Sequence, residues 1–286
     1  MGYRTKTLGL FGFMLIFMVA IGYLIGGYFM GNWIAGTIVF LIIAAVMNLV
    51  SYFYGHKFIL KHYNAKPIKE SDHPTLFNTV REISYEADIE MPKVAILPMG
   101  VPNAFATGRN ENNAVVAVSQ GLLNILDKEE LKGVIAHEVA HIKNRDMLVM
   151  SVAATLAGAV TILARMAWWQ IFFSRRRVSP ILLVTMILAP IGAIIIKMAI
   201  SRKREYHADE EGARISKNPN ALADALGKLE RSNQKDPLKN QNPTTSSLFI
   251  VNPFTRSAFV NLFSSHPPIE KRIENLREMA VDFSYL

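Results

Sequence analysis

The first part of the chain has no charged residue between Thr7 and Gly55. A helix needs about 20 apolar residues to cross the hydrocarbon core of a bilayer, so this stretch is long enough for two spans. Glycines cluster between Gly26 and Asn32 and favour a turn there. The pattern predicts a transmembrane hairpin in residues 1–56. A cleaved signal peptide is the alternative, but its apolar region is shorter than this stretch.

Two further apolar blocks lie in the middle of the chain, from Met147 to about Phe173 and from Val178 to Ile200. Each has roughly the length of a membrane span, which is about 17–25 residues. Arg165 interrupts the first block, and Lys197 lies near the end of the second, where its side chain can reach the interface. We interpret residues 147–200 as a second membrane hairpin, which gives about four hydrophobic membrane segments. Buried helices of a large core are the alternative.

The other two stretches, residues 57–146 and 201–286, have the pattern of a folded domain that the second hairpin interrupts. In the first of them, Asp127 to Glu130 form a capping box that begins a helix. The other predicted elements are a helix over Leu76–Ala87 that begins at Ser71-Asp72-His73-Pro74, a strand over Lys93–Pro98, a hairpin of Asn103–Thr107 and Ala114–Val118, helices over Ser201–Ile215 and Ala221–Glu230, a polar loop over Ser232–Ser247, and a last helix from Pro267 to about Val281.

Positive charge flanks the N-terminal hairpin, and the formal net charge of the chain is +8. By the positive-inside rule both flanks are cytoplasmic, which predicts a multi-pass protein of the cell membrane with its N-terminus and folded domain in the cytoplasm. Because the basic residues flank the apolar segments, we do not expect nucleic acid as a partner. Cysteine is absent, which excludes disulfides and thiol chemistry. The flanking charges are Arg4, Lys6, Lys57, Lys61, Lys66 and Lys69.

Candidate chemistry lies in the helix that the capping box begins, where residues 136–142 read AHEVAHI. Residues four apart lie on one face of a helix, so His137 and His141 point the same way and can share one tetrahedral zinc ion. Glu138 can take a proton from a zinc-bound water, whose pKa the metal lowers toward about 7. A charged turn of an ordinary helix produces the same pattern by chance, so the zinc interpretation requires a third ligand.

The acidic candidates for that ligand lie in SRKREYHADEEG, where Glu205 and Asp209 are four residues apart on a predicted helix. Glu205 would bind the metal, and Asp209 would accept a hydrogen bond from the other ring nitrogen of His137. Gly212 on the same side would let the two helices approach closely. His207 points about 200° away from Glu205, so we expect it at the surface. A solvated charged face is the alternative for the two carboxylates.

HEVAHIKNRD and SRKREYHAD, both beside predicted membrane segments, resemble the metal motif of the HtpX family of membrane zinc metallopeptidases, whose relatives include the CAAX prenyl endopeptidases. The similarity covers nearly the whole chain, through PNAFATGR and SSHPPIEKRIENL. It implies one zinc ion per chain, held by His137, His141 and Glu205, with Glu138 as the catalytic base. It also implies an integral membrane α-helical protein with an α+β gluzincin-like zinc metalloprotease domain that faces the cytoplasm.

The resemblance gives meaning to further residues. Asn103, Ala104 and Phe105 match the family's edge-strand motif, and such a strand can pair with an extended substrate. A plain strand of the sheet is the alternative. His266 can approach the scissile carbonyl and help to stabilise the oxyanion, or it can cap or pack a helix. Asp146 follows the second histidine by five residues, and we interpret it as structural, at the junction of the zinc helix and the membrane.

The predicted function is therefore a zinc endopeptidase with protein substrates in or beside the lipid bilayer; the family implies misfolded or damaged membrane proteins. A transporter or channel with functional intramembrane charges at Arg165 and Lys197 is the alternative from another class, but it leaves the metal motif unexplained. A protease that processes prenylated proteins would need a chamber built from more membrane spans than this chain has. A catalytically inactive membrane scaffold would be favoured if a metal ligand were missing, and none is. If both middle segments cross the membrane, the cluster Arg175 to Arg177 between them lies on the outer side, which contradicts the positive-inside rule. We nevertheless favour two full spans.

Overall fold

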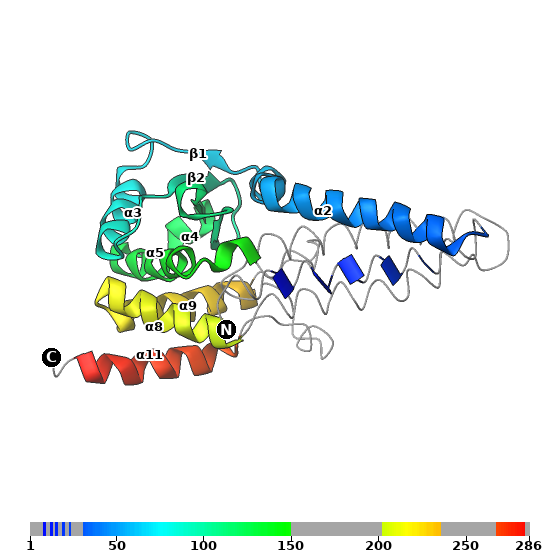
Figure 1. Ribbon diagram of the computed structural model, residues 1–286. Helices are drawn as coiled ribbons and strands as arrows, with labels where there is room; N and C mark the ends of the chain where they lie inside the picture. The colour runs from blue at the N-terminus through cyan, green and yellow to red at the C-terminus, as the bar shows by residue number, and fades with distance from the viewer. Residues whose placement is uncertain are drawn as a thin grey trace.

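The computed structural model describes residues 31–149, 202–235 and 267–283, together with scattered positions between 8 and 23. Within these ranges a small mixed sheet and a group of helices form a domain, and the helix α2 (Trp33–His62) runs away from it (Figure 1). The predictions for most of the first span, for the second hairpin from residue 150 onward and for His266 fall outside the described residues.

The helix α2 is the only one in the described ranges that is long and apolar enough to cross a membrane. Its first turn is capped by the side chain of Asn32, which accepts a hydrogen bond from the N–H of Ala35, and Gly31 before it has a φ of 62°. The predicted turn before the second span is confirmed at these residues. The helix continues past Gly55 to His62, so the predicted domain boundary at residue 56 lies inside it.

The strands of the described sheet have the order β1-β2-β4-β3. The parallel pair of β2 and β4 lies in the middle, and β1 and β3 are antiparallel to their neighbours. The hairpin of β3 and β4 is confirmed, and β3 lies at the edge of this sheet, as predicted. The bounds are Lys66–Pro67 for β1, Lys93–Leu97 for β2, Ala104–Thr107 for β3 and Val115–Ser119 for β4.

The turn of this hairpin requires glycine at position 108. Gly108 has a φ of 151°, and a Cβ there would lie 2.6 Å from the carbonyl oxygen of Asn113, in the 3-10 turn η1 (Glu111–Asn113). A side chain at this position would therefore strain the backbone and collide with it.

The helix α5 (Lys128–Lys143) lies at the centre of the domain. It contacts α3 (Pro74–Glu86) and β3 on one side and α8 (Arg202–Ser216) and α9 (Pro219–Lys235) on the other, and α11 (Ile269–Phe283) packs on α8 and α9 (Figure 1). The short helix α4 (Gln120–Ile125) precedes α5. Fully buried aliphatic side chains fill the space around α5, among them Val116, Val134, Ile135, Val139, Leu222 and Leu226.

Some helix ends differ from the predicted ones, and one is confirmed. The cap of α3 is His73, whose Nδ1 accepts a hydrogen bond from the N–H of Leu76 at 3.2 Å, and Pro74 follows it. The predicted polar loop begins too early at Ser232, because α9 continues to Lys235. The predicted capping box of α5 is confirmed.

The other face of the sheet packs against the end of α2. Ile59 and Tyr63 form a buried cluster with Leu97, Phe105 and Ala117, and the rings of Tyr63 and Phe105 are 5.6 Å apart. The long apolar helix and the edge strand β3 are therefore joined by a shared core, which places this side of the domain beside the end of α2 (Figure 1).

Candidate metal centre

The motif predicted to bind metal lies on α5, in the most buried part of the domain. His137, Glu138 and His141 are 2%, 4% and 3% exposed. The two histidine rings lie edge to face, with their centroids 4.8 Å apart, as expected for residues four apart on one helix face. The capping box of Asp127 and Glu130 fixes the first turn of this helix.

The helix α8 crosses α5 at very short distance, and a glycine makes this possible. A Cβ at Gly212 would lie 2.8 Å from the backbone nitrogen of His137 and 2.9 Å from its Cα. Ala208, one turn earlier, is fully buried. The small residues thus allow the close approach that the sequence predicted, and they bring Glu205 and Asp209 to the histidines.

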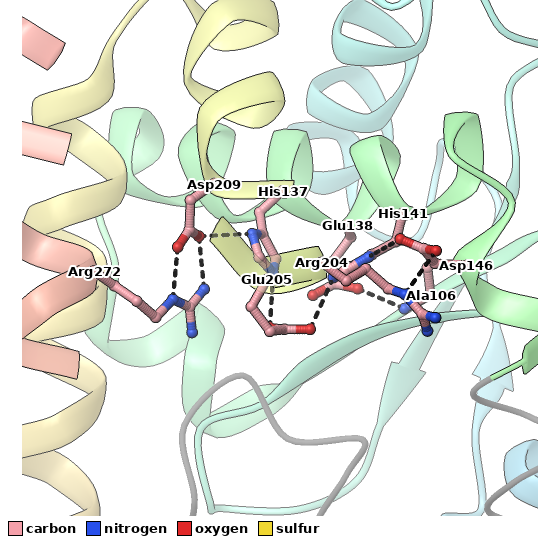
Figure 2. A network of polar contacts seen from close by, with 9 residues as sticks. All are labelled: Ala106, His137, Glu138, His141, Asp146, Arg204, Glu205, Asp209 and Arg272. Atoms are coloured by element: carbon pink, nitrogen blue, oxygen red, sulfur yellow. Dashed lines mark hydrogen bonds and ion pairs between the residues drawn. The ribbon is translucent and has the colours of Figure 1, made fainter. Parts of the chain in front are cut away.

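Glu205 completes a cluster of three possible metal ligands with His137 and His141 (Figure 2). Its carboxylate oxygens lie 3.9 Å from Nε2 of His137 and 3.6 Å from Nε2 of His141. Two donor atoms bound to one tetrahedral zinc at about 2.0–2.1 Å are about 3.4 Å apart. The three donors therefore have the chemistry of a zinc site, and their ligand atoms all lie within 4.8 Å of one another.

The opposite ring nitrogens of the two histidines face carboxylates. Nδ1 of His137 lies 2.9 Å from Oδ1 of Asp209, which is the contact that the four-residue spacing predicted. Nδ1 of His141 lies 3.3 Å from Oδ2 of Asp146. An N–H at Nδ1 that donates to a carboxylate leaves Nε2 as the unprotonated atom, directed toward Glu205. These contacts orient both rings with Nε2 toward Glu205, as a shared metal ion would require.

The role of Asp146 is larger than the sequence analysis assigned to it. We interpreted it as a junction residue, but its side chain lies against His141. Arg145, just before it, has a left-handed φ of 58°, and this turn after the end of α5 brings the carboxylate back to the helix. Its position five residues after His141, close to the end of the helix, was the available signal.

Two arginines that the sequence analysis gave no role lie behind these carboxylates (Figure 2). Nε and Nη2 of Arg272 each donate to one oxygen of Asp209, both at 2.7 Å. Nε of Arg204 lies 2.9 Å from Oδ1 of Asp146. A buried carboxylate is costly without a cationic or hydrogen-bonding partner, so Asp209 itself was a signal that an arginine or lysine lies near it.

The electrostatic environment separates the acidic groups. Burial raises the pKa of Glu138, although the nearby histidines and a hydrogen bond from the backbone of Ala106 oppose it. Burial alone would also raise the pKa of Asp209, but the charge and hydrogen bonds of Arg272 hold it below its usual value. Glu138 is therefore the more basic carboxylate of the two, and Asp209 remains a permanent anion.

The edge strand β3 lies beside Glu138 on the other side of the cluster. The N–H of Ala106 donates a hydrogen bond to Oε2 of Glu138 at 2.7 Å. Asn103, Ala104 and Phe105 are all buried, and the side chain of Phe105 packs toward α2 and away from the histidines. It is the backbone of the strand that lies near the site.

The sequence also assigned places to two histidines outside the metal motif, His207 and His266. His207 is exposed on α8, as predicted, and does not join the cluster. His266 lies outside the described residues, so its predicted place near the scissile carbonyl stays a prediction.

Comparisons with known proteins agree with this geometry. Residues 70–280 match peptidase family M48. The chain is 48% identical to the "Protease HtpX homolog" of Syntrophobacter fumaroxidans over 288 residues, which cover 98% of this chain and 100% of that relative. It is 49% identical to the protein of the same name from Pyrococcus abyssi over 288 residues, 99% of this chain and 98% of the relative. The crystal structure of S. mikatae Ste24p shares the fold, with a TM-score of 0.51 and 18% identity; the match covers 96% of this chain but 65% of the Ste24p chain.

Proposed function

Given that this chain belongs to peptidase family M48 and is a metalloprotease of the HtpX type, we propose that it is a membrane-embedded zinc endopeptidase that acts at the cytoplasmic face. The observation that carries the proposal is the buried cluster of His137, His141 and Glu205 beside Glu138. Protein substrates follow from the family, and we propose membrane proteins, misfolded or damaged ones among them, as the class that is cleaved.

The donor set supports zinc as the metal. Two imidazole nitrogens and one carboxylate are a common ligand set of catalytic zinc, and a fourth position stays open for water or substrate. His137, His141 and Glu205 would hold the ion. When bound there, zinc polarises the scissile carbonyl and lowers the pKa of a water molecule toward about 7.

We assign the role of general base to Glu138. Its raised pKa makes it a better proton acceptor than an exposed carboxylate, and the N–H of Ala106 fixes its orientation. It would accept a proton from the attacking water and return it to the amine that leaves. Asp209 and Asp146 orient the two histidines and take no part in this proton transfer.

The substrate is proposed to pair with β3. This strand lies at the edge of the described sheet, and its backbone is tied to Glu138, so an extended peptide added there would run past the base. We also propose that His266 stabilises the oxyanion. Because His266 lies outside the described ranges, this role rests on the sequence resemblance alone.

The membrane part of the proposal rests on α2. A helix of 30 residues is about 45 Å long, which exceeds a hydrocarbon core of about 30 Å. Only 17% of its most apolar 18-residue segment is buried, whereas the core helix of a soluble protein is mostly buried. The end of the helix shares a core with β3, so it is part of the folded domain, unlike a signal peptide that is removed. Lys57 and Lys61 lie toward the end that joins the domain, and this supports a cytoplasmic domain.

The test uses detergent-purified full-length protein, wild type beside Glu138→Gln. Zinc content and cleavage of casein are measured in both. We expect stoichiometric zinc in both proteins and a loss of cleavage in the variant, because a general base contributes about 10²–10⁴-fold to the rate. Retained cleavage in Glu138→Gln would remove this residue from the base role. Absence of both zinc and cleavage in folded wild-type protein would refute the zinc endopeptidase.

A further inference from the structure

Each histidine of the metal centre stands at the inner end of a chain of three buried residues (Figure 2). In each chain the histidine contacts a carboxylate through Nδ1, and the carboxylate is held by an arginine. All members are 7% exposed or less. The two chains are His137–Asp209–Arg272 and His141–Asp146–Arg204.

The chains bring together parts of the sequence that are far apart. Arg272 lies on α11, 63 residues after Asp209 on α8, and Arg204 lies on α8 next to Glu205 while its partner Asp146 follows α5. A carboxylate that is buried without a cation would rotate to find other donors or would become protonated. The arginines thus decide whether each carboxylate keeps the orientation that its histidine needs.

We propose that Arg272 and Arg204 are positioning residues of the metal centre, which act on zinc affinity through Asp209 and Asp146. This inference rests on the proposed function, because it assumes that the cluster holds zinc. Neither arginine is assigned a contact with substrate or a part in the proton transfer.

The two chains are unequal. Asp209 receives two parallel hydrogen bonds of 2.7 Å from Arg272, and its contact with His137 is 2.9 Å. Nε of Arg204 lies 2.9 Å from Oδ1 of Asp146, and the contact of Asp146 with His141, at 3.3 Å, is longer than that of Asp209 with His137. The bidentate pair with Arg272 fixes the carboxylate of Asp209 in position and plane, at the shorter of the two histidine contacts. Loss of Arg272 should therefore affect the metal more than loss of Arg204.

A purely structural role is the competing explanation. Arg272 also fastens α11 to α8, so its removal lowers stability whether or not it acts on the metal. The two roles differ in what they change: a structural residue lowers the stability of the metal-free protein, whereas a positioning residue also weakens zinc binding by the molecules that remain folded.

The experiment measures the zinc dissociation constant of full-length protein in detergent, by competition with a chelator, together with the melting temperature of the metal-free protein. The variants are Arg272→Met, Arg272→Lys and Arg204→Met. The matched control is Arg277→Met on α11, which removes an exposed ion pair with Asp224. We expect about 10–100-fold weaker zinc binding for Arg272→Met, the usual cost of losing support behind a metal ligand, with a smaller loss for Arg204→Met and no change for Arg277→Met.

Arg272→Lys retains the charge without the bidentate geometry, so we expect an intermediate affinity and an altered visible spectrum of the cobalt-substituted protein. Should Arg272→Met fail to fold, the neutral pair Asp209→Asn with Arg272→Met replaces it, and its affinity should equal that of Asp209→Asn alone. Unchanged zinc affinity in the Arg272 variants, with only a lower melting temperature, would overturn the inference while the endopeptidase proposal stands. Wild-type protein that binds no zinc would overturn both.

Discussion

The backbone N–H of Ala106 donates a hydrogen bond to Oε2 of Glu138, although the two residues are 32 positions apart in the sequence. Ala106 belongs to the edge strand β3, and Glu138 belongs to the central helix α5. The bond lowers the pKa of Glu138 and so opposes the larger effect of burial, which raises it. The strand proposed to pair with substrate therefore also orients the proposed base and moderates the rise of its pKa.

Ala106→Pro should lower kcat by roughly tenfold or more, because proline has no N–H to hold the carboxylate. The loss of a hydrogen bond to the ionised carboxylate raises the pKa of Glu138 further. Since the base must be deprotonated, the acidic limb of the pH profile of kcat/KM should move to higher pH. Steady-state kinetics of peptide cleavage across the acidic range would check both effects.

The matched control for this change is Ala106→Gly, which keeps the N–H and should keep the position of the acidic limb. Zinc content should be the same in both variants and in the wild type, because the N–H of Ala106 binds Glu138, which is not one of the three proposed ligands. An acidic limb that stays in place in Ala106→Pro would show that this bond does not tune the base.

Gly212→Ala should destabilise the protein and weaken the metal site together. The added Cβ would lie within 3 Å of the backbone of His137, and backbone atoms cannot rotate away. The helices α5 and α8 must separate, which displaces Glu205 and Asp209 from the histidines. We expect a loss of about 1–3 kcal/mol in the free energy of unfolding, as for other overpacked cores, and a lower zinc content after dialysis.

Gly227→Ala on α9 is the control for helix propensity. Among the described residues its Cβ would meet the side-chain end of Arg231 at 3.4 Å and Ile273 at 3.9 Å. Alanine is favoured over glycine in a helix by about 1 kcal/mol, so this variant should be as stable as the wild type or more so. If Gly212→Ala behaved in the same way, the close helix crossing would not matter for the site.

The sequence was informative wherever a signal is local. The capping box of Asp127 and Glu130 predicted the start of α5, and the four-residue spacing predicted the pairing of His137 with Asp209. Both depend on the geometry of one helix turn, which the spacing of residues in the sequence determines directly.

The predicted number of four membrane spans is only partly tested by the structure. The helix α2 is the only candidate span in the described ranges, and the other predicted segments lie outside them.

Contacts between distant segments carried no such signal. Arg272 pairs with Asp209 across 63 positions, and no spacing rule joins them. The end of α2 was also missed, because the uncharged run stops at Gly55 whereas the helix continues until Ile59 and Tyr63 reach the core of the sheet. Helix ends depend on capping and tertiary contacts, and the charge pattern records neither.

A short epitope tag inserted beside Arg176 should be accessible to protease from outside the membrane. This follows if residues 147–200 form two full spans and the domain on both sides of them is cytoplasmic. A tag in the loop near Gly31 should behave in the same way, and one after Tyr285 should be protected in intact cells. Protection of the Arg176 tag would instead indicate that the second pair of segments enters the bilayer without crossing it.

Glu205→Gln should abolish stable zinc binding at micromolar metal, because the amide removes the only anionic group of the proposed ligand set. Glu205 is 1% exposed and lies 3.6 Å from His141, so the change also removes one partner of a buried pair, and the stability of the metal-free protein must be measured separately. Asp209→Asn should be milder, with about 10–100-fold lower affinity, because it leaves all three donors in place. Zinc content after dialysis against chelator, with the melting temperature of the metal-free forms, separates the two variants. A Glu205→Gln protein that retains its zinc would show that the third ligand lies elsewhere in the chain.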